Sequence, residues 1–157
     1  MGVRKKIITH KEEIATIIKT SQVCHLSMMD IDSGPYTIPM NFGFANNCFY
    51  FHTGPGGKKL ELLEKNPNVC ISISFDEKLF VRHEEVACSY SMLYKSVVAK
   101  GKAEFVTDPI QKRDQLNILM KHYTSKDDFK FNDPAINNVV LFKVECNEIT
   151  AHNRLNS

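Results

Sequence analysis

A histidine, a threonine, a glycine-rich turn and two lysines follow one another in the segment HTGPGGKK, residues 52–59. The segment ends a β-like run at His52 and Thr53 and begins a helical run at Lys58 and Lys59. Glycines let backbone N–H groups converge, and a helix N-terminus adds unpaired donors and a partial positive charge. These residues therefore form a candidate phosphate site. The alternative is a plain surface turn followed by solvated lysines.

Two well-known nucleotide-binding motifs do not fit this segment. A P-loop requires a glycine at the position of His52 and a serine or threonine at the position of Lys59. The dinucleotide fingerprint requires a glycine at the position of Lys59 and a surrounding parallel βαβ unit. The sequence therefore disfavours a nucleoside triphosphatase and a Rossmann dehydrogenase.

The elements around this segment are predicted from periodicity and turn residues. Thr9 and Glu12 form a capping box for a first helix over about 10–20, Gly101 marks a bulge or a bend, and Asp108 caps a helix that begins at Pro109. Strands are predicted at 23–29, 35–44, 48–53, 69–75, 94–106 and 139–144, a helix at 58–65, and a C-terminal tail without regular structure at about 149–157. The pattern predicts a mainly β, antiparallel, Greek-key-like small barrel or closed sheet with peripheral helices.

Composition indicates a single domain, residues 1–157. The chain is 43% hydrophobic and 24% charged, and its net charge of +2 is spread without a basic stripe, which disfavours nucleic acid as a partner. No segment resembles a signal peptide or a membrane span, so we expect a cytoplasmic protein. The five cysteines are expected to be reduced thiols, and no metal site is expected because Cys88 and His83 lack further ligands at suitable spacing.

A series of short motifs resembles the flavin-binding split barrels related to pyridoxamine 5′-phosphate oxidase, and within them the nitroimidazole-resistance branch. The order and spacing of the motifs carry the resemblance from about Thr9 to Glu148. The motifs are PMNFG (39–43), YFH (50–52), GKKLELL (57–63), NPNVC (66–70), YKSV (94–97) and GKAEFV (101–106).

The resemblance implies a homodimer with flavin mononucleotide (FMN) at the subunit interface. Lys59 matches the family's phosphate lysine, with Lys58 beside it, and each has a solvated helix lysine as its alternative. The remaining implied flavin contacts are strand residues, which could equally be structural: Met40, Asn41, His52, Thr53 and Ser96.

The resemblance also implies a flavin-dependent oxidoreductase that passes electrons from NADH or NADPH to a small planar acceptor such as a 5-nitroimidazole. The flavin itself would carry the chemistry, so no catalytic side chain is predicted. FAD is an alternative to FMN, and a non-catalytic flavin-binding or haem-binding protein is an alternative to the enzyme. The chain lacks the tryptophan that close relatives carry after the position of Cys88 and has Tyr90 nearby, which leaves ring stacking and acceptor choice open.

Overall fold

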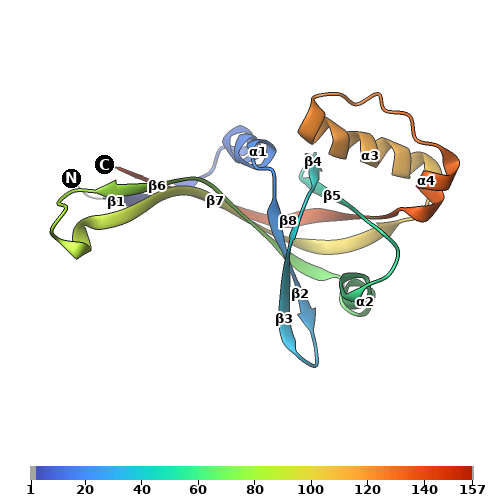
Figure 1. Cartoon of the computed structure of the whole chain (residues 1–157), viewed down its shortest axis with the longest axis horizontal. Coiled ribbons are helices and arrows are strands. Elements are labelled where there is room, and N and C mark those ends of the chain that lie inside the picture. Colours follow the sequence, from blue (N-terminus) through green and yellow to red (C-terminus); the bar gives the residue numbers. More distant parts are fainter. Residues whose placement is uncertain (1–2, 157) are drawn as a thin grey trace.

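The computed structural model describes residues 3–156 and contains one antiparallel sheet with helices around it (Figure 1). The strands are β1 (Val3–Ile8), β2 (Cys24–Asp30), β3 (Gly34–Met40), β4 (Gly43–Ala45), β5 (Cys48–Thr53), β6 (Asn68–Val81), β7 (Tyr90–Val106) and β8 (Val140–Asn156). The helices are α1 (Lys11–Thr20), α2 (Lys58–Lys65), α3 (Pro109–Thr124) and α4 (Asp133–Asn138), with a short 3-10 turn at Ala87–Ser89.

The strands follow the order β3-β2-β6-β7-β8-β5-β4, and β1 pairs with β8. β3 and β4 follow each other in the chain yet lie at opposite ends of this order, so the sheet is split rather than closed. The predicted mainly β, antiparallel architecture with peripheral helices is confirmed, and only the closure of the sheet is wrong. The physical reason is that the chain leaves the sheet at residues 41–42 and β5 then pairs with β8.

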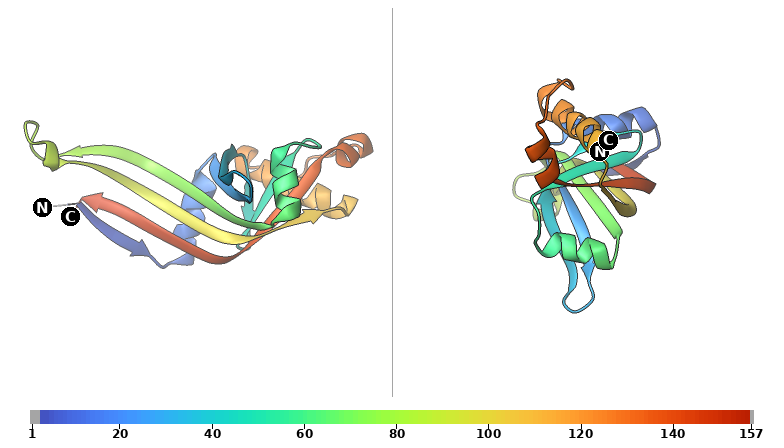
Figure 2. Two further views of the ribbon diagram at one scale, coloured as in Figure 1. Left: turned by 90° about the horizontal axis from the view of Figure 1, so that it is seen from below. Right: turned by 90° about the vertical axis from the view of Figure 1, so that its right-hand side faces the viewer.

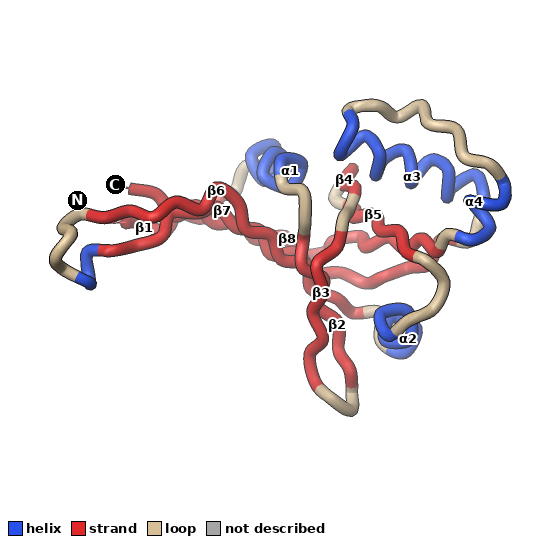
Figure 3. Tube along the Cα trace, in the orientation of Figure 1, coloured by secondary structure: helices blue, strands red, loops and turns tan. Residues whose placement is uncertain are grey.

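The molecule has a compact end and a projecting arm (Figures 2 and 3). At the compact end, α1, α2 and α3 surround the sheet, and at the other end β1 and the distal parts of β6, β7 and β8 extend away together. The core lies in the compact end and is rich in aromatic rings, including the fully buried Phe42, Phe49, Phe51 and Phe142. Stacked and tilted ring contacts join these residues, with centroids 5.0–6.3 Å apart.

Several local predictions agree with the structure. The Asp108 side chain accepts a hydrogen bond from the Gln111 N–H at 2.8 Å and caps α3, as predicted. The strand register shifts between Lys100 and Gly101, where a bulge or a bend was predicted. A Cβ at Gly101 would overlap the Glu145 carbonyl oxygen and lie 2.8 Å from a Val144 methyl, so only glycine fits there.

Other predictions are wrong at the ends of the chain. Helix α1 begins after His10, which makes no side-chain cap hydrogen bond, so the Thr9–Glu12 capping box does not form. Residues 3–8 form β1, which sequence patterns missed. The predicted tail at 149–156 is instead the end of β8, held between β1 and β7, while Ser157 lies outside the described residues. These two segments are strands because they pair with strands distant in the sequence, and local sequence patterns do not reveal such pairing.

Candidate functional site

The β5–α2 junction, residues 52–59, is built by a strand, a glycine loop and a helix start. Gly56 and Gly57 have φ of +83° and +98°, a conformation in which any other residue is strained. A Cβ at either position would meet nothing within 4 Å, so the glycines are needed for conformation and not for space. Gly57 is the N-cap of α2 and supplies no side-chain cap. The first N–H groups of α2 therefore remain donors for a ligand.

Lys59 is the cation of this junction that could pair with a bound anion. Its side chain is half-buried, and among residues 3–156 it makes no ion pair within 4.0 Å. The charge of Lys59 also affects the nearby His52. Partial desolvation lowers the pKa of the His52 imidazole, and the positive charge of Lys59 lowers this pKa further. His52 is therefore a neutral imidazole beside a cation at physiological pH. Both groups can donate a hydrogen bond to an anion.

Lys58, by contrast, already has partners. Its Nζ lies 2.9 Å from Asp30 Oδ2 and 4.8 Å from the centre of the Tyr36 ring. Hydrogen bonds from the Ser33 hydroxyl and from Lys58 hold the pKa of Asp30 well below its usual range. The contact joins the start of α2 to the β2–β3 hairpin. Sequence patterns missed it because Asp30 is 28 positions away, in what looks like an ordinary turn.

Thr53 follows His52 in β5 but does not share its side of the strand. Alternation places the Thr53 side chain on the same side as the fully buried Phe51, and His52 on the other. The structure therefore brings His52 and Lys59 together and turns Thr53 away from them.

Met40 and Asn41 lie at the other end of the β2–β3 hairpin from the turn that contacts Lys58. Met40 is only 8% exposed and belongs to the core. The Asn41 side-chain amide donates to the Tyr123 hydroxyl at 3.3 Å and to the Gln22 carbonyl at 3.4 Å. The structure thus gives both side chains structural contacts, and their predicted flavin contacts stay a prediction.

Ser96 lies on the polar face of the sheet, away from the buried face that carries Val97. It is half-buried, and its partners across the two neighbouring strands are Ser74 and His152. Ser74 and His152 were not predicted as site residues. The sequence signal for Ser74 is the alternation of serines with apolar residues in β6, and His152 in β8 has no such signal.

Comparison with known proteins gives one family and several related structures. The family model for pyridoxamine 5′-phosphate oxidase matches residues 10–153. A proposed 5-nitroimidazole antibiotic resistance protein from Bacteroides thetaiotaomicron VPI-5482 has 40% sequence identity and a TM-score of 0.84, over 100% of this chain and 93% of that one. This match confirms the resemblance found in the sequence. A search of curated proteins gives no match.

More distant structures share the fold. The FAD and heme binding protein of Mycobacterium smegmatis has 16% identity and a TM-score of 0.83, over 96% of this chain and 74% of that one. A FAD-binding protein of Mesorhizobium loti has 20% identity and a TM-score of 0.68, over 99% of this chain and 100% of that one. Within residues 3–156, no helix is both long and apolar enough to cross a membrane.

Proposed function

Because the chain belongs to the pyridoxamine 5′-phosphate oxidase family, we propose that it binds a flavin and acts as a flavin-dependent oxidoreductase. The observation that carries this proposal is Lys59, a half-buried cation at a helix start with no carboxylate partner in the described part of the chain. Positive-φ glycines and an uncapped helix beside it suit a phosphate. FMN presents such a phosphate at the end of its ribityl chain. FAD presents a phosphate at the same point, and so it is the alternative.

The residues of this chain would have separate tasks in holding the cofactor. The Lys59 ammonium and the first N–H groups of α2 would bind the phosphate, and His52 would donate a further hydrogen bond from its neutral ring. Lys58 would hold the β2–β3 hairpin against the same helix through Asp30. Ser96 and Ser74 would offer hydroxyl groups along the polar face of the sheet.

A bound flavin supplies hydride transfer at its N5 atom. The proposed electron donor is NADH or NADPH, and the proposed acceptor is a small planar molecule such as a 5-nitroimidazole. The support for this acceptor is the 40% identity to the Bacteroides protein. The chain would bind the flavin, orient it and limit access of water to it.

A homodimer with the flavin at the subunit interface is part of the proposal. The arm exposes large apolar side chains in its strands: Ile7 and Leu79 are each 64% exposed, and Met92 is 45% exposed. Leu79 and Met92 are cross-strand partners and so lie on one face of the arm. A second copy that covers this face would remove the apolar surface from water.

The first test identifies the bound cofactor and measures its affinity. The purified protein should show a flavin absorption spectrum, and heat should release FMN identifiable by mass. The Lys59→Gln variant should bind FMN about thirty-fold more weakly, because a lost charge-assisted hydrogen bond costs about 2 kcal/mol. The FMN-loaded protein should oxidise NADH or NADPH and reduce a 5-nitroimidazole, which is measured as a decrease in the absorbance of the nitro compound.

Lys65→Gln is the matched control, since Lys65 lies in the last turn of the same helix, away from the loop. It should bind FMN like the unmodified protein, and light scattering should report a dimer for both variants. Released haem, or a protein that takes up no flavin, would overturn the proposed cofactor. Equal FMN affinity of Lys59→Gln and Lys65→Gln would overturn the phosphate site.

A further inference from the structure

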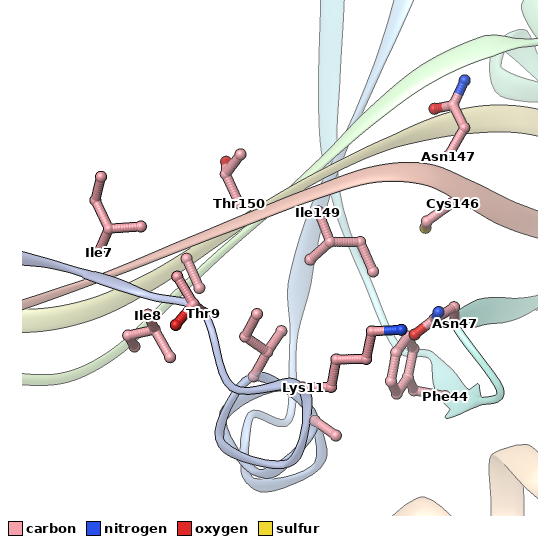
Figure 4. A pocket seen from close by; sticks show the side chains of 13 residues that line it. Ile7, Ile8, Thr9, Lys11, Phe44, Asn47, Cys146, Asn147, Ile149 and Thr150 are labelled. Atoms are coloured by element: carbon pink, nitrogen blue, oxygen red, sulfur yellow. The ribbon is translucent and has the colours of Figure 1, made fainter.

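A pocket lies beside the start of α1, at the opposite end of β5 from the glycine loop (Figure 4). Its volume is about 400 Å³, and its walls come from β1, α1, β4 and β8. Most of the wall is apolar. The apolar side chains used in the following argument are Ile8, Ile14, Ala15, Phe44, Ile149 and Ala151.

The polar part of this pocket carries a single charge. Lys11 is the one charged side chain among the thirteen lining residues, and within residues 3–156 it makes no ion pair within 4.0 Å. Figure 4 shows its ammonium group projecting toward the side that holds Asn47 and Phe44. Glu12 and Glu13 belong to the same helical turn but do not line the pocket. Lys11 is also the first residue of α1, whose start has no side-chain cap and adds partial positive charge.

The one thiol in the wall does not offset this charge. Burial raises the pKa of Cys146 to about 12, with smaller contributions from Cys48 and Glu145. Cys146 is therefore a neutral, polarisable wall group at physiological pH. The pocket combines apolar walls with one cation, Lys11, which forms no ion pair with the described residues.

We propose that this pocket binds a small carboxylate with an apolar body. The isoleucine and phenylalanine side chains would cover an alkyl chain or a ring, and the Lys11 ammonium would pair with the carboxylate, with the Asn47 amide as a further donor. A volume of about 400 Å³ is within the range of sites for small organic molecules, which are mostly apolar with a few placed polar groups. The site is separate from the β5–α2 junction and does not depend on the proposed flavin.

Octanoate and 1-octanol are suitable probes because they share a chain length and differ in charge. We would titrate each into the full-length, isotope-labelled protein and follow backbone and methyl NMR signals. Octanoate should shift signals of Ile8, Ile14 and Ile149, and 1-octanol should bind more weakly. Lys11→Gln should weaken octanoate binding about two- to fivefold, because one exposed ion pair is lost, and should leave 1-octanol binding unchanged.

Two further variants complete the test. Lys19→Gln changes a lysine of the same helix that does not line this pocket, and octanoate affinity should stay the same. Ala15→Leu fills the pocket from a half-buried helix position and should abolish binding while α1 stays folded. The proposal is overturned if octanoate shifts the signals of Leu79 and Met92 but none of Ile8, Ile14 and Ile149, or if Lys11→Gln binds octanoate as tightly as Lys19→Gln does. If Ala15→Leu fails to fold, the comparison of Lys11→Gln with Lys19→Gln decides alone.

Discussion

At the β5–α2 junction the Lys59 ammonium has no carboxylate partner in the described chain, whereas at the β3–β4 turn, residues 41–42, the polar groups bond to one another. There the Tyr123 hydroxyl accepts from the Phe42 N–H at 3.0 Å and donates to the Gln22 carbonyl at 2.7 Å. Both segments follow a strand, and both contain polar residues that the resemblance assigned to a flavin. The difference lies in whether the fold itself already uses the polar groups.

This difference separates two roles that look alike in sequence. A polar group with good internal partners stabilises the fold, and moving it to a ligand would cost those bonds. A half-buried cation without a carboxylate partner carries a desolvation cost, and an anion would relieve that cost. The β5–α2 junction therefore fits a ligand site, and the β3–β4 turn fits a structural connection to α3.

Glycine substitutions should give the largest contrast between the two regions. A Cβ at Gly43, next to the β3–β4 turn, would lie 2.8 Å from the Leu119 Cα. Gly43→Ala should therefore lower the free energy of unfolding by about 3 kcal/mol, because α3 must move away. Gly57→Ala has open space but a φ of +98°, and it should cost about 1 kcal/mol while weakening FMN binding.

Urea unfolding and FMN titration of the two variants would measure both effects. Gly34→Ala serves as the control, because Gly34 also has a positive φ and open space but lies in the β2–β3 hairpin. It should lose stability as Gly57→Ala does and keep its FMN affinity. A loss of FMN binding in Gly34→Ala as large as in Gly57→Ala would contradict a local role of the loop.

Removal of the Tyr123 hydroxyl should have a smaller effect on stability. Tyr123→Phe leaves the Phe42 N–H without its partner, and it leaves the Gln22 carbonyl with only the longer bond from the Asn41 amide. The free energy of unfolding should fall by about 1–2 kcal/mol, and FMN affinity should stay the same. Tyr90→Phe is a control at an exposed hydroxyl on the arm and should lose less stability. Weaker FMN binding in Tyr123→Phe would show that the β3–β4 turn takes part in the ligand site after all.

Two histidines, His52 and His122, should give the smallest contrast, through their response to pH. Burial lowers the pKa of both His52 and His122. The unfolded chain therefore binds more protons than the native protein below the unfolded-state value of about 6.5. Stability should fall as pH decreases through that value, and the fall should level off below the native pKa values.

A bound phosphate should distinguish the two rings. It should raise the pKa of His52, beside Lys59, because an anion favours the imidazolium form. His122 should not respond, since its ring bonds the Ser21 carbonyl at 2.7 Å in the other region. NMR titration of the two rings with and without FMN would measure both values. An unchanged pKa of His52 on FMN binding would remove it from the phosphate site.

Local patterns predicted the elements that depend on local chemistry. The helix at Lys58–Lys65, the strand at Cys48–Thr53 and the Asp108 cap agree with the structure because each depends on neighbouring residues. The single predicted strand at 35–44 is instead β3 and β4, separated at residues 41–42. The sequence analysis did not predict α4, because a helix of 6 residues is too short to show a clear apolar periodicity.

For the candidate site, too, the sequence analysis predicted the local features and missed the contacts between distant segments. The glycine loop and Lys59 could be found because a phosphate site needs neighbouring residues in one segment. The partners of Lys58 and of Asn41 could not be found, because Asp30 and Tyr123 come from other parts of the chain. Two adjacent lysines look equivalent in sequence, and only the hairpin that reaches one of them makes them different.

Motif order and local conformational preference in the sequence are enough to identify the family, the antiparallel mainly β class and the position of the glycine loop. Three features became visible only in the three-dimensional structure. They are the polar groups that already have internal partners, the arm formed by β1 and the end of β8, and the pocket with Lys11 beside α1. The physical reason is that an ion pair, a strand register and a cavity each join residues distant in the chain. Such contacts depend on how the whole sheet folds and not on any single segment.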